Sequence, residues 1–386
     1  MHPDIKCISM KNPFVTSGYA GKEYFCDRKK ETEQLTRMLE NENNVALISP
    51  RRLGKTELIH HCFAQDRLAE EYYTFIIDIY ATVSLQDFVF AFGKAVINTL
   101  RSKPRKIWES FINILASLKS YITYDIDGKP VWGLSIGDIV SPSATLDEIL
   151  HYLETADKPC IVAIDEFQQI TKYSNGGEVE ATLRTHIQKC VNTHFIFSGS
   201  QRHLMTSMFT SPARPFYQSV ILFNLKPIPE ETYTAFATSH FEKAGKKLMP
   251  QVVSNIYNQF ESITYYLQRV MNYLYMLTPA GGTCHEQLID IALDEIMDIS
   301  TDSYQTLMAQ IPEKQRTLLI AIAKEGEAQA ISSGSFIKKH HLPSASSVLS
   351  AAKGLLEKDL ITKEGDTYSV YDLFLRMWIC RNIKKT

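Results

Sequence analysis

The feature that most constrains the fold is a short apolar run that leads through a tight loop into a helix. Residues 44–50 are mostly apolar, and residues 55–64 carry apolar side chains at the spacing of a helix. A strand, a loop and a helix in immediate succession are typical of α/β proteins. The loop consists of Pro50, Arg51, Arg52, Leu53 and Gly54.

Four further apolar runs follow, each of a length that suits one buried strand. They cover residues 73–80, 160–167, 194–200 and 219–225. The runs are continuous rather than alternating, as is required of strands buried on both faces of a parallel sheet. We therefore predict an α/β domain with about five core strands over residues 1–226. An insertion near residues 103–145 interrupts it, with a hairpin over 121–136 that turns at Asp127-Gly128.

The periodicity changes after Leu225, where Pro227 and Pro229 break the chain. From Glu230 to Gln310 it is helical, with no convincing strand. We therefore predict a separate helical domain over residues 227–310.

A third domain is predicted over residues 311–386. Ser344 is a plausible N-cap for the last of three helices, expected at 313–324, 335–340 and 344–360, and short strands are expected at 361–363 and 368–370. Three helices followed by a hairpin are the outline of a winged helix-turn-helix. The apolar segment at 371–379 is too short to span a membrane, and we expect it to pack the hairpin against the helical domain.

Composition and charge exclude several classes of protein. Hydrophobic residues make up 45% of the 386 residues and charged residues 22%, which excludes disordered, collagen-like and membrane-spanning chains. The net charge of −2 gives no overall attraction to nucleic acid, although residues 311–386 carry 12 Lys and Arg against 8 Asp and Glu. Met1–Tyr19 lacks the apolar core of a signal peptide, and the seven cysteines lack metal-like spacing. We expect a cytoplasmic protein with reduced thiols.

Positions 49–56 match the phosphate-binding signature Gly-x-x-x-x-Gly-Lys-Ser/Thr, except that Ser49 replaces the first glycine. Gly54, Lys55 and Thr56 supply a helix N-terminus for phosphate, an ammonium group for its outer oxygens and a hydroxyl for Mg²⁺. The replacement of glycine by Ser49 costs conformational energy only if this first position of the signature needs a positive φ. The expected nucleotide contacts are Ser49, Pro50, Arg51, Arg52, Leu53, Gly54, Lys55, Thr56 and Glu57. The sequence does not decide whether Arg51 and Arg52 face solvent, DNA or the adenine side of the pocket.

Two adjacent acids, Asp165 and Glu166, end the third apolar run. Adjacent carboxylates at the end of a buried strand are costly unless they have partners. Magnesium and an attacking water would provide them, with Asp165 holding the metal and Glu166 polarising the water. An acidic pair that merely opens an exposed loop is the alternative. Both motifs in this order, each after a strand, favour a nucleoside-triphosphate site.

Two further features leave their alternatives open. Ser198 or Ser200, at the end of the fourth run, could place a hydroxyl near the γ-phosphate, or the pair could simply form a tight turn. Arg214, in a loop before the fifth run, could reach phosphate in cis or across a subunit boundary. The favoured alternative is an exposed surface arginine.

These motifs, with Tyr24–Thr32 and Phe197–Ser200, resemble those of the archaeal-type ATPases, which lie near the STAND branch of P-loop ATPases and the origin-recognition AAA+ proteins. The likeness covers nearly the whole chain. It implies a P-loop core with an AAA+-like, five-stranded parallel sheet, followed by a helical lid domain and a C-terminal winged helix-turn-helix. It also implies ATP and Mg²⁺ between core and lid.

The resemblance implies roles for individual residues. The strand that ends at Ser200 would lie between the two signature strands, and Ser200 resembles the sensor that lies near the γ-phosphate. Arg28, in Asp27-Arg28, matches a Gly-Arg element near the base and ribose. Ser262-Ile263-Thr264 departs from the Gly-x-Pro of many STAND lids. The resemblance also implies that Lys55 and Thr56 bind phosphate and Mg²⁺. Asp165 would bind the metal, and Glu166 would contact the attacking water.

We expect slow hydrolysis of ATP by water, with bound nucleotide setting the angle between core, lid and winged helix. One alternative is an ATP-responsive DNA-binding module with little turnover. Another is a signalling or defence scaffold that forms homo-oligomers on ATP and recruits a protein partner. Double-stranded DNA would meet the third helix of the winged domain, near Lys338, Lys339, Lys353 and Lys358.

Overall fold

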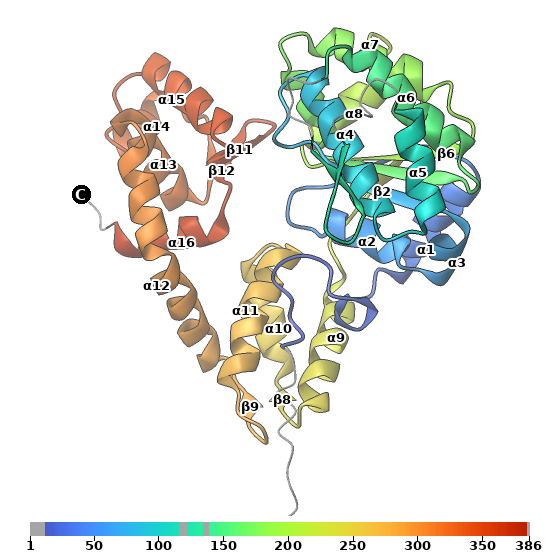
Figure 1. The fold of residues 1–386 in the computed structure, drawn as a ribbon. Helices are drawn as coiled ribbons and strands as arrows, with labels where there is room; N and C mark the ends of the chain where they lie inside the picture. The colour runs from blue at the N-terminus through green and yellow to red at the C-terminus, as the bar shows by residue number, and fades with distance from the viewer. Residues whose placement is uncertain (1–11, 116–121, 134–138, 384–386) are drawn as a thin grey trace, which may run out of the picture. The chain divides into compact units, whose positions relative to one another are not determined.

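The computed structural model describes residues 12–115, 122–133 and 139–383 (Figure 1). The described chain forms two compact units. One contains the chain as far as His240 together with Glu261–Asn272, and the other contains Phe241–Phe260 and the chain from Tyr273 onward. Parts of the sequence predictions for residues 1–19 and for the hairpin at 121–136 lie outside the described residues.

The first unit is built on a five-stranded sheet in which every pairing is parallel, so the predicted core is confirmed. The inner strands are buried at every residue, as their continuous apolar runs predict, whereas the two edge strands are partly exposed. The order across the sheet is β2-β5-β6-β1-β7. The strands are β1 (Val45–Ile48), β2 (Tyr73–Asp78), β5 (Cys160–Asp165), β6 (Thr193–Gly199) and β7 (Ile221–Asn224).

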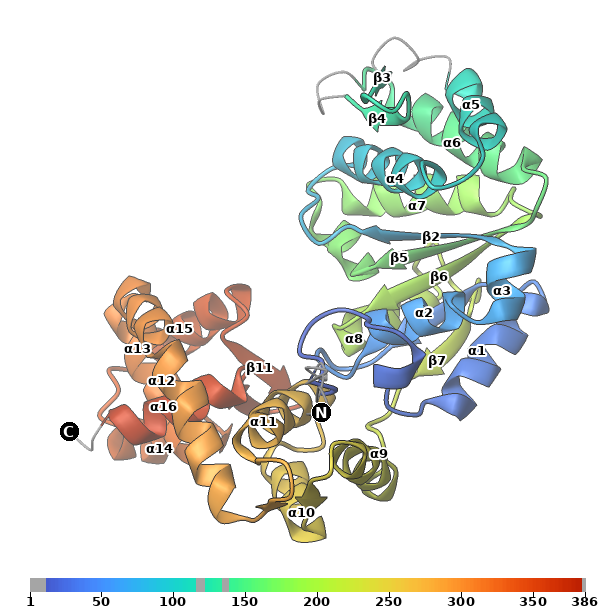
Figure 2. The ribbon, with the colours of Figure 1, turned by 60° about the horizontal axis from the view of Figure 1, so that its bottom comes forward.

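Helices cover both faces of this sheet (Figure 2). Alternate residues of β1 face opposite layers: Ala46 and Ile48 belong to one apolar cluster, and Val45 and Leu47 to the other. The first layer contains α4 (Leu85–Leu100), α6 (Pro142–Thr155), α7 (Gly176–Ile187) and α8 (Arg202–Thr210). The second contains α1 (Lys29–Glu40), α2 (Lys55–Phe63) and α3 (Asp66–Glu71). The described residues of this unit also contain two short 3₁₀ helices, η1 (Lys22–Tyr24) and η4 (Phe167–Lys172).

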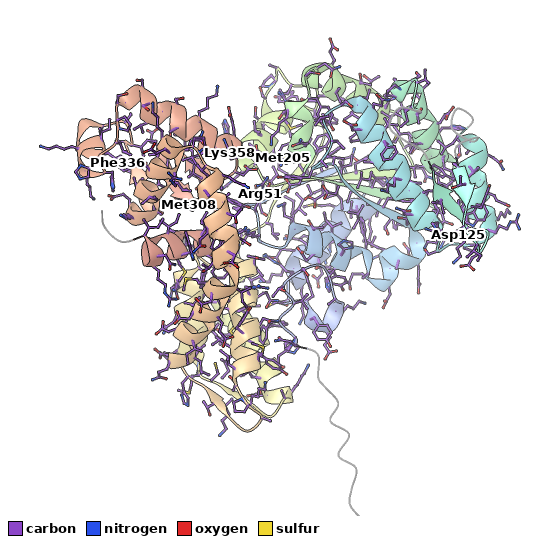
Figure 3. The ribbon with its side chains drawn as sticks, turned by 60° about the vertical axis from the view of Figure 1, so that its left-hand side comes forward. Arg51, Asp125, Met205, Met308, Phe336 and Lys358 are labelled. Carbon is purple, nitrogen blue, oxygen red and sulfur yellow. The ribbon has the colours of Figure 1, made fainter. Side chains whose placement is uncertain are left out.

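The insertion forms an outer layer on α4 and α6. It consists of α5 (Arg105–Ile114) and an antiparallel hairpin of β3 (Ile122–Tyr124) and β4 (Pro130–Trp132). The Asp125 carboxylate accepts hydrogen bonds from the backbone N–H groups of Asp127 and Lys129, which fixes the predicted turn. Figure 3 places Asp125 at the opposite side of this unit from Arg51. The insertion is therefore remote from the loop that follows β1.

The helical segment after Leu225 contains α9 (Glu230–Lys243), α10 (Pro250–Gln259), α11 (Thr264–Leu277) and α12 (Gln287–Gln310). It also contains a parallel pair of two-residue strands, β8 (Lys247–Leu248) and β9 (Thr283–Cys284), so the prediction of no strand here is wrong. Two-residue strands are too short to leave an apolar run in the sequence. No helix in the described ranges combines the length and apolarity needed to cross a membrane.

The end of the chain has the predicted helices and hairpin, with one additional strand. Ser344 caps the third helix by accepting from Ser347 N at 3.3 Å. The final apolar segment forms a helix that contacts α12, α13 and β12, and Trp378 Nε1 in it donates to Thr301 Oγ1. The elements are α13 (Glu313–Glu325), β10 (Glu327–Gln329), α14 (Gly334–Lys339), α15 (Ala345–Glu357), β11 (Ile361–Glu364), β12 (Thr367–Val370) and α16 (Leu373–Asn382). The sheet order is β10-β12-β11, and β10, Glu-Ala-Gln, has no apolar run by which to predict it.

Candidate functional site

The order of the strands brings the sequence motifs to one edge of the sheet. Strand β6 lies between β1 and β5, as the family resemblance predicts. Ile48 at the end of β1 pairs with Gly199 at the end of β6, and β5 ends next to them with Asp165. In a parallel sheet, the crevice outside the carboxyl ends of the strands is the usual place for a ligand.

The loop after β1 accommodates Ser49 without backbone strain. The positive φ angles of this loop fall on Arg52 (69°) and Gly54 (89°). Ser49 N donates to Gly199 O at 3.4 Å, and Ser49 Oγ donates to Pro50 O at 2.9 Å. The replacement of the first signature glycine is thus compatible with the loop conformation.

The loop ends at the N-terminus of α2, where Gly54 occupies the N-cap position without a side-chain hydrogen bond. Its left-handed φ is one that glycine adopts at little cost. The first N–H groups of a helix lack partners within the helix, so this end favours an anion. Lys55, the first residue of α2, is only 6% exposed. Burial lowers the pKa of Lys55, while the carboxylates of Glu166 and Asp165 act to raise it.

Thr56 and Asp165 meet at the same edge. Thr56 Oγ1 donates to Asp165 Oδ2 at 2.5 Å, and Asp165 Oδ1 accepts from Glu166 N at 3.0 Å. A hydroxyl and a carboxylate side by side are the oxygen ligands that suit Mg²⁺ when phosphate and water complete its shell. Among the residues that the structure describes, no group of three or more His, Cys, Asp or Glu side chains could hold a metal by itself.

Glu166 lies at the centre of a second cluster. Ser200 Oγ donates to Glu166 Oε2 at 2.8 Å, and Arg51 Nε donates to Ser200 Oγ at 3.1 Å. Glu166 has a φ of 56°, a left-handed conformation that disfavours any residue other than glycine. Ser198 is fully buried and its Oγ has no hydrogen-bond partner. Of the two candidate serines, Ser200 is therefore the one that joins the acidic motif.

Gln168 is a site residue that the sequence analysis missed. Its Nε2 donates to Glu166 Oε2 and lies 3.4 Å from Ser200 Oγ. The side chain is 2% exposed, and η4 turns the chain so that Gln168 reaches back to a residue two positions earlier. The signal in the sequence is the pair of glutamines, Gln168 and Gln169, that directly follows Asp-Glu-Phe.

Arg28 braces the loop rather than extending into open space. Its guanidinium donates to Leu53 O at 3.1 Å, to Lys226 O at 2.5 Å and to Glu31 Oε1 at 3.0 Å. Burial lowers the pKa of Arg28, while the bond to Glu31 acts to raise it. These bonds join three separate segments, and the implied role of Arg28 near the base stays a prediction.

Arg52 contacts the first turn of α11. Its guanidinium donates to the Tyr266 hydroxyl and lies 4.9 Å from the centre of the Tyr265 ring. Tyr265 N also donates to Arg52 O at 3.1 Å. The segment Ser262-Ile263-Thr264 is therefore directly followed by residues that contact the loop.

Arg214 forms an ion pair with a residue outside the sequence motifs. Its guanidinium lies 2.5 Å from Glu180 Oε2 on α7. Glu180 is 1% exposed, and burial raises the pKa of its carboxyl group although Arg214 acts to lower it. The reach of Arg214 to phosphate stays a prediction, while its ion pair has a clear structural role.

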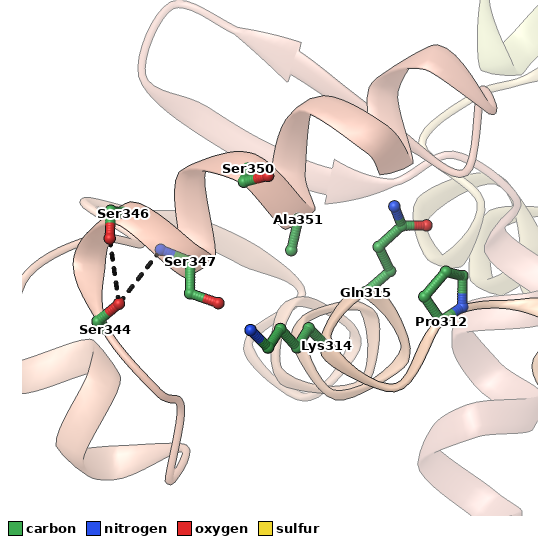
Figure 4. Close-up of a pocket in the computed structure, with 8 residues that line it drawn as sticks. All are labelled: Pro312, Lys314, Gln315, Ser344, Ser346, Ser347, Ser350 and Ala351. Atoms are coloured by element: carbon green, nitrogen blue, oxygen red, sulfur yellow. Dashed lines mark hydrogen bonds between the residues drawn. The ribbon is translucent and has the colours of Figure 1, made fainter.

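The winged domain presents a mixed surface. Lys339 and His340 lie 2.6 and 2.7 Å from Glu325 Oε1, and together they lower the pKa of Glu325. A pocket of about 480 Å³ opens beside the N-terminus of α15 (Figure 4). It is lined by Pro312, Lys314, Gln315, Ser344, Ser346, Ser347, Ser350 and Ala351.

Comparison with known proteins supports the arrangement. Residues 25–270 match the family of ATPase domains predominantly from Archaea, and residues 302–381 match a probable winged helix domain. No curated protein matches the chain.

Solved structures share the fold along nearly the whole chain. A Walker-type ATPase of Pyrococcus abyssi is 18% identical, with a TM-score of 0.62 over 95% of this chain and 99% of that one. The ORC2 protein of Aeropyrum pernix, in ADPNP–ADP complexes, is 12% identical, with a TM-score of 0.52 over 96% and 97%. The ORC1 protein of Aeropyrum pernix, in complex with DNA, is 12% identical, with a TM-score of 0.51 over 94% of each chain. The predicted architecture, a P-loop core with a C-terminal winged helix, is confirmed.

The Arg214–Glu180 pair generates a stability prediction. Replacing Arg214→Met leaves a buried carboxylate unpaired. We expect the free energy of unfolding at pH 8 to fall by about 2–3 kcal/mol, less than the range of about 3–5 for fully buried pairs, because a third of the Arg214 side chain is exposed. Urea denaturation of the full chain measures the change.

The same pair generates a dependence on pH. Because the pKa of folded Glu180 is raised, the folded chain binds more protons than the unfolded chain, and stability falls as pH rises above about 4.5, the pKa of an ordinary glutamate. The loss in Arg214→Met should therefore be smaller at pH 5 than at pH 8. The double variant Arg214→Met with Glu180→Gln should recover most of it, and equal losses in all these conditions would contradict the pairing.

A side chain at Gly199 should be costly. A Cβ added there would collide with the Met205 side chain and with Gln168 Oε1. We expect Gly199→Ala to destabilise the chain by about 1–3 kcal/mol in thermal unfolding, because well-packed side chains must move. Gly177→Ala in α7 is the matched control, since its Cβ would meet nothing within 4 Å, and it should instead stabilise by about 0.5–1 kcal/mol. Similar effects at both positions would contradict the crowding at Gly199.

Proposed function

Because the chain belongs to the family of ATPase domains found predominantly in Archaea, we propose that it binds ATP with Mg²⁺ and hydrolyses it to ADP and phosphate. The observation that carries this proposal is the meeting of Lys55, Thr56, Asp165, Glu166 and Ser200 at one edge of the sheet. The phosphates would lie at the N-terminus of α2, against its N–H groups and the Lys55 ammonium group.

The donor set at Thr56 and Asp165 fits a magnesium ion. Asp165 is 7% exposed and its carboxylate accepts from the Thr56 hydroxyl, so the two oxygens lie side by side. We infer that these two side chains hold the ion together with phosphate and water. When bound, Mg²⁺ would neutralise charge on the phosphates and favour departure of ADP.

Glu166 is the proposed general base. An attacking water would give its proton to the Glu166 carboxylate as its oxygen bonds to the γ-phosphorus. The bond from that phosphorus to the bridging oxygen breaks, and its electron pair leaves with ADP. Ser200 and Gln168 both donate to Glu166 Oε2, which holds the carboxylate in one orientation and leaves its other oxygen as the acceptor for the water.

Bound nucleotide would also act on α11 through Arg52. The backbone and the guanidinium of Arg52 both contact the first turn of this helix. A change in the phosphate-binding loop on hydrolysis would therefore alter the support of α11, which is the proposed route from the nucleotide to the lid segment. In this respect the protein would be a nucleotide-driven conformational switch.

The ATPase proposal is tested by turnover of purified full-length protein with Mg²⁺. We expect Glu166→Gln to lower turnover by about 10²–10⁴-fold while ATP still binds, because the base is lost and the phosphate contacts remain. Lys55→Ala should weaken ATP binding by about 10–100-fold, the value of a charge-assisted hydrogen bond of about 1.5–3 kcal/mol. Arg37→Ala, an exposed change on α1, is the control and should match the native chain.

Two results would contradict the proposal. A native chain that binds ATP but never turns it over would make the protein a nucleotide-responsive switch without catalysis. A chain that binds no nucleotide would remove the site altogether.

DNA binding by the winged domain is a second candidate function, favoured by the exposed Lys353 and Lys358 at the end of α15. Lysine contacts with phosphate release counterions, so retention on duplex DNA should weaken steeply between 50 and 200 mM salt. In the double variant Lys353→Ala with Lys358→Ala, the slope of log K against log salt should fall by about 1 per lysine. Absence of retention even at 50 mM salt would favour a protein partner instead.

A further inference from the structure

The two adjacent arginines of the phosphate-binding loop face different parts of the first unit. Arg52, with its φ of 69°, extends toward Tyr265 and Tyr266 at the start of α11. Arg51 extends toward the ends of β2 and β6, where its Nε donates to Ser200 Oγ at 3.1 Å. Neighbours in sequence thus have separate surroundings, so they are expected to have separate roles.

Arg51 belongs to the same cluster as the proposed general base. Ser200 Oγ accepts from Arg51 and donates to Glu166 Oε2 at 2.8 Å, so one hydroxyl links the guanidinium to the carboxylate. The guanidinium carbon lies 5.8 Å from the centre of the Tyr80 ring in the loop after β2. The charge of Arg51 also acts to lower the pKa of Lys55, which shows that the two cations lie close enough to interact.

Two neighbouring cations repel each other, and an anion that binds both of them relieves the repulsion. Lys55 is the first residue of α2, and Arg51 is joined through Ser200 to Glu166, whose carboxylate also interacts with the Lys55 charge. In the proposed reaction the γ-phosphoryl group must lie between the Lys55 ammonium group and the water held by Glu166. Arg51, one hydrogen bond from Ser200, is therefore at the γ-phosphoryl end of the nucleotide and not at its base.

We propose that Arg51 is a catalytic residue whose guanidinium binds the γ-phosphoryl group and stabilises the charge that develops on it, so that the loop supplies its own arginine in cis. This rests on the ATPase function proposed above. The bond from Nε to Ser200 fixes the plane of the guanidinium, whose terminal nitrogens form the fork that matches phosphoryl oxygens. Arg51 carries charge only, and it neither gains nor loses a proton during hydrolysis.

The ion pair of Arg214 supports this assignment. Arg214 was the other candidate for the same task, and its guanidinium is held by the buried carboxylate of Glu180. Moving it to a phosphate would leave that carboxylate unpaired inside the core, which is costly.

The test compares native protein with Arg51→Ala, Arg51→Lys and the surface control Arg37→Ala, all as full-length chains with Mg²⁺. Single-turnover hydrolysis gives the rate of the chemical step, and equilibrium binding gives the affinities for ATP, for ADP and for ADP with aluminium fluoride, a mimic of the transferring phosphoryl group. We expect Arg51→Ala to lower the rate by about 10³–10⁵-fold, as loss of a cis or trans arginine does in other phosphoryl-transfer enzymes. The ATP affinity should change by less than the rate.

Three accompanying results are expected. Arg51→Ala should lose the extra affinity for ADP with aluminium fluoride over ADP alone, while ADP binding stays near the native value and shows that the chain is folded. Guanidinium ion added to Arg51→Ala should restore part of the rate. Arg51→Lys should restore little, because an ammonium group lacks the planar fork.

The outcomes separate this proposal from the ATPase function itself. Native protein without turnover refutes both. Native turnover together with an undiminished rate in Arg51→Ala refutes the role of Arg51 alone. Equal losses of rate and of ATP affinity, without rescue by guanidinium, would mean that Arg51 only binds the substrate.

Discussion

The site depends on the parallel pairing of β1 with β6 and of β6 with β5. Each strand carries a different chemical group just beyond its carboxyl end, and parallel pairing places all these ends at one edge. Antiparallel pairing of any one strand would send its motif to the opposite edge. The contacts between Thr56 and Asp165, and between Ser200 and Glu166, follow from this register and from the burial of all three strands. The apolar runs that specify a buried sheet therefore also specify where the polar residues meet.

Much of this arrangement could be predicted because its signals are local. A continuous apolar run predicts a buried strand, and the glycine, lysine and threonine that follow β1 predict an anion site at a helix N-terminus. The position of β6 between β1 and β5 depends on pairing between distant segments. It was predicted from the family resemblance and not from local patterns. The predictions were weakest for elements of two or three residues, β8, β9 and β10, because so short a strand leaves no periodic pattern.

The contacts of individual side chains could not be predicted from the sequence. Two adjacent arginines in a loop give no signal of their separate partners. Arg51 donates to Ser200 after β6, and Arg52 donates to Tyr266 at the start of α11. The partner of Arg214 is Glu180 on α7. The helical periodicity of that segment does not identify which residue Glu180 contacts. Gln168 could be recognised only once η4 was known to turn it back toward Glu166. In each case the deciding contact joins segments that are far apart in the chain or are folded back by a turn.

The bonds of Arg28 bear on the order in which the protein folds. Its guanidinium joins Leu53 O to Lys226 O, a partner 198 residues away, and β1 pairs with residues of both β6 and β7. Contacts of such sequence separation form slowly, because a long loop must close before they are made. During synthesis, the bond from Arg28 to Lys226 can form only after the chain has emerged as far as Lys226, and the contacts of Arg52 only after Tyr266. A nascent chain that stops earlier would carry every motif of the site and still lack the support that shapes it.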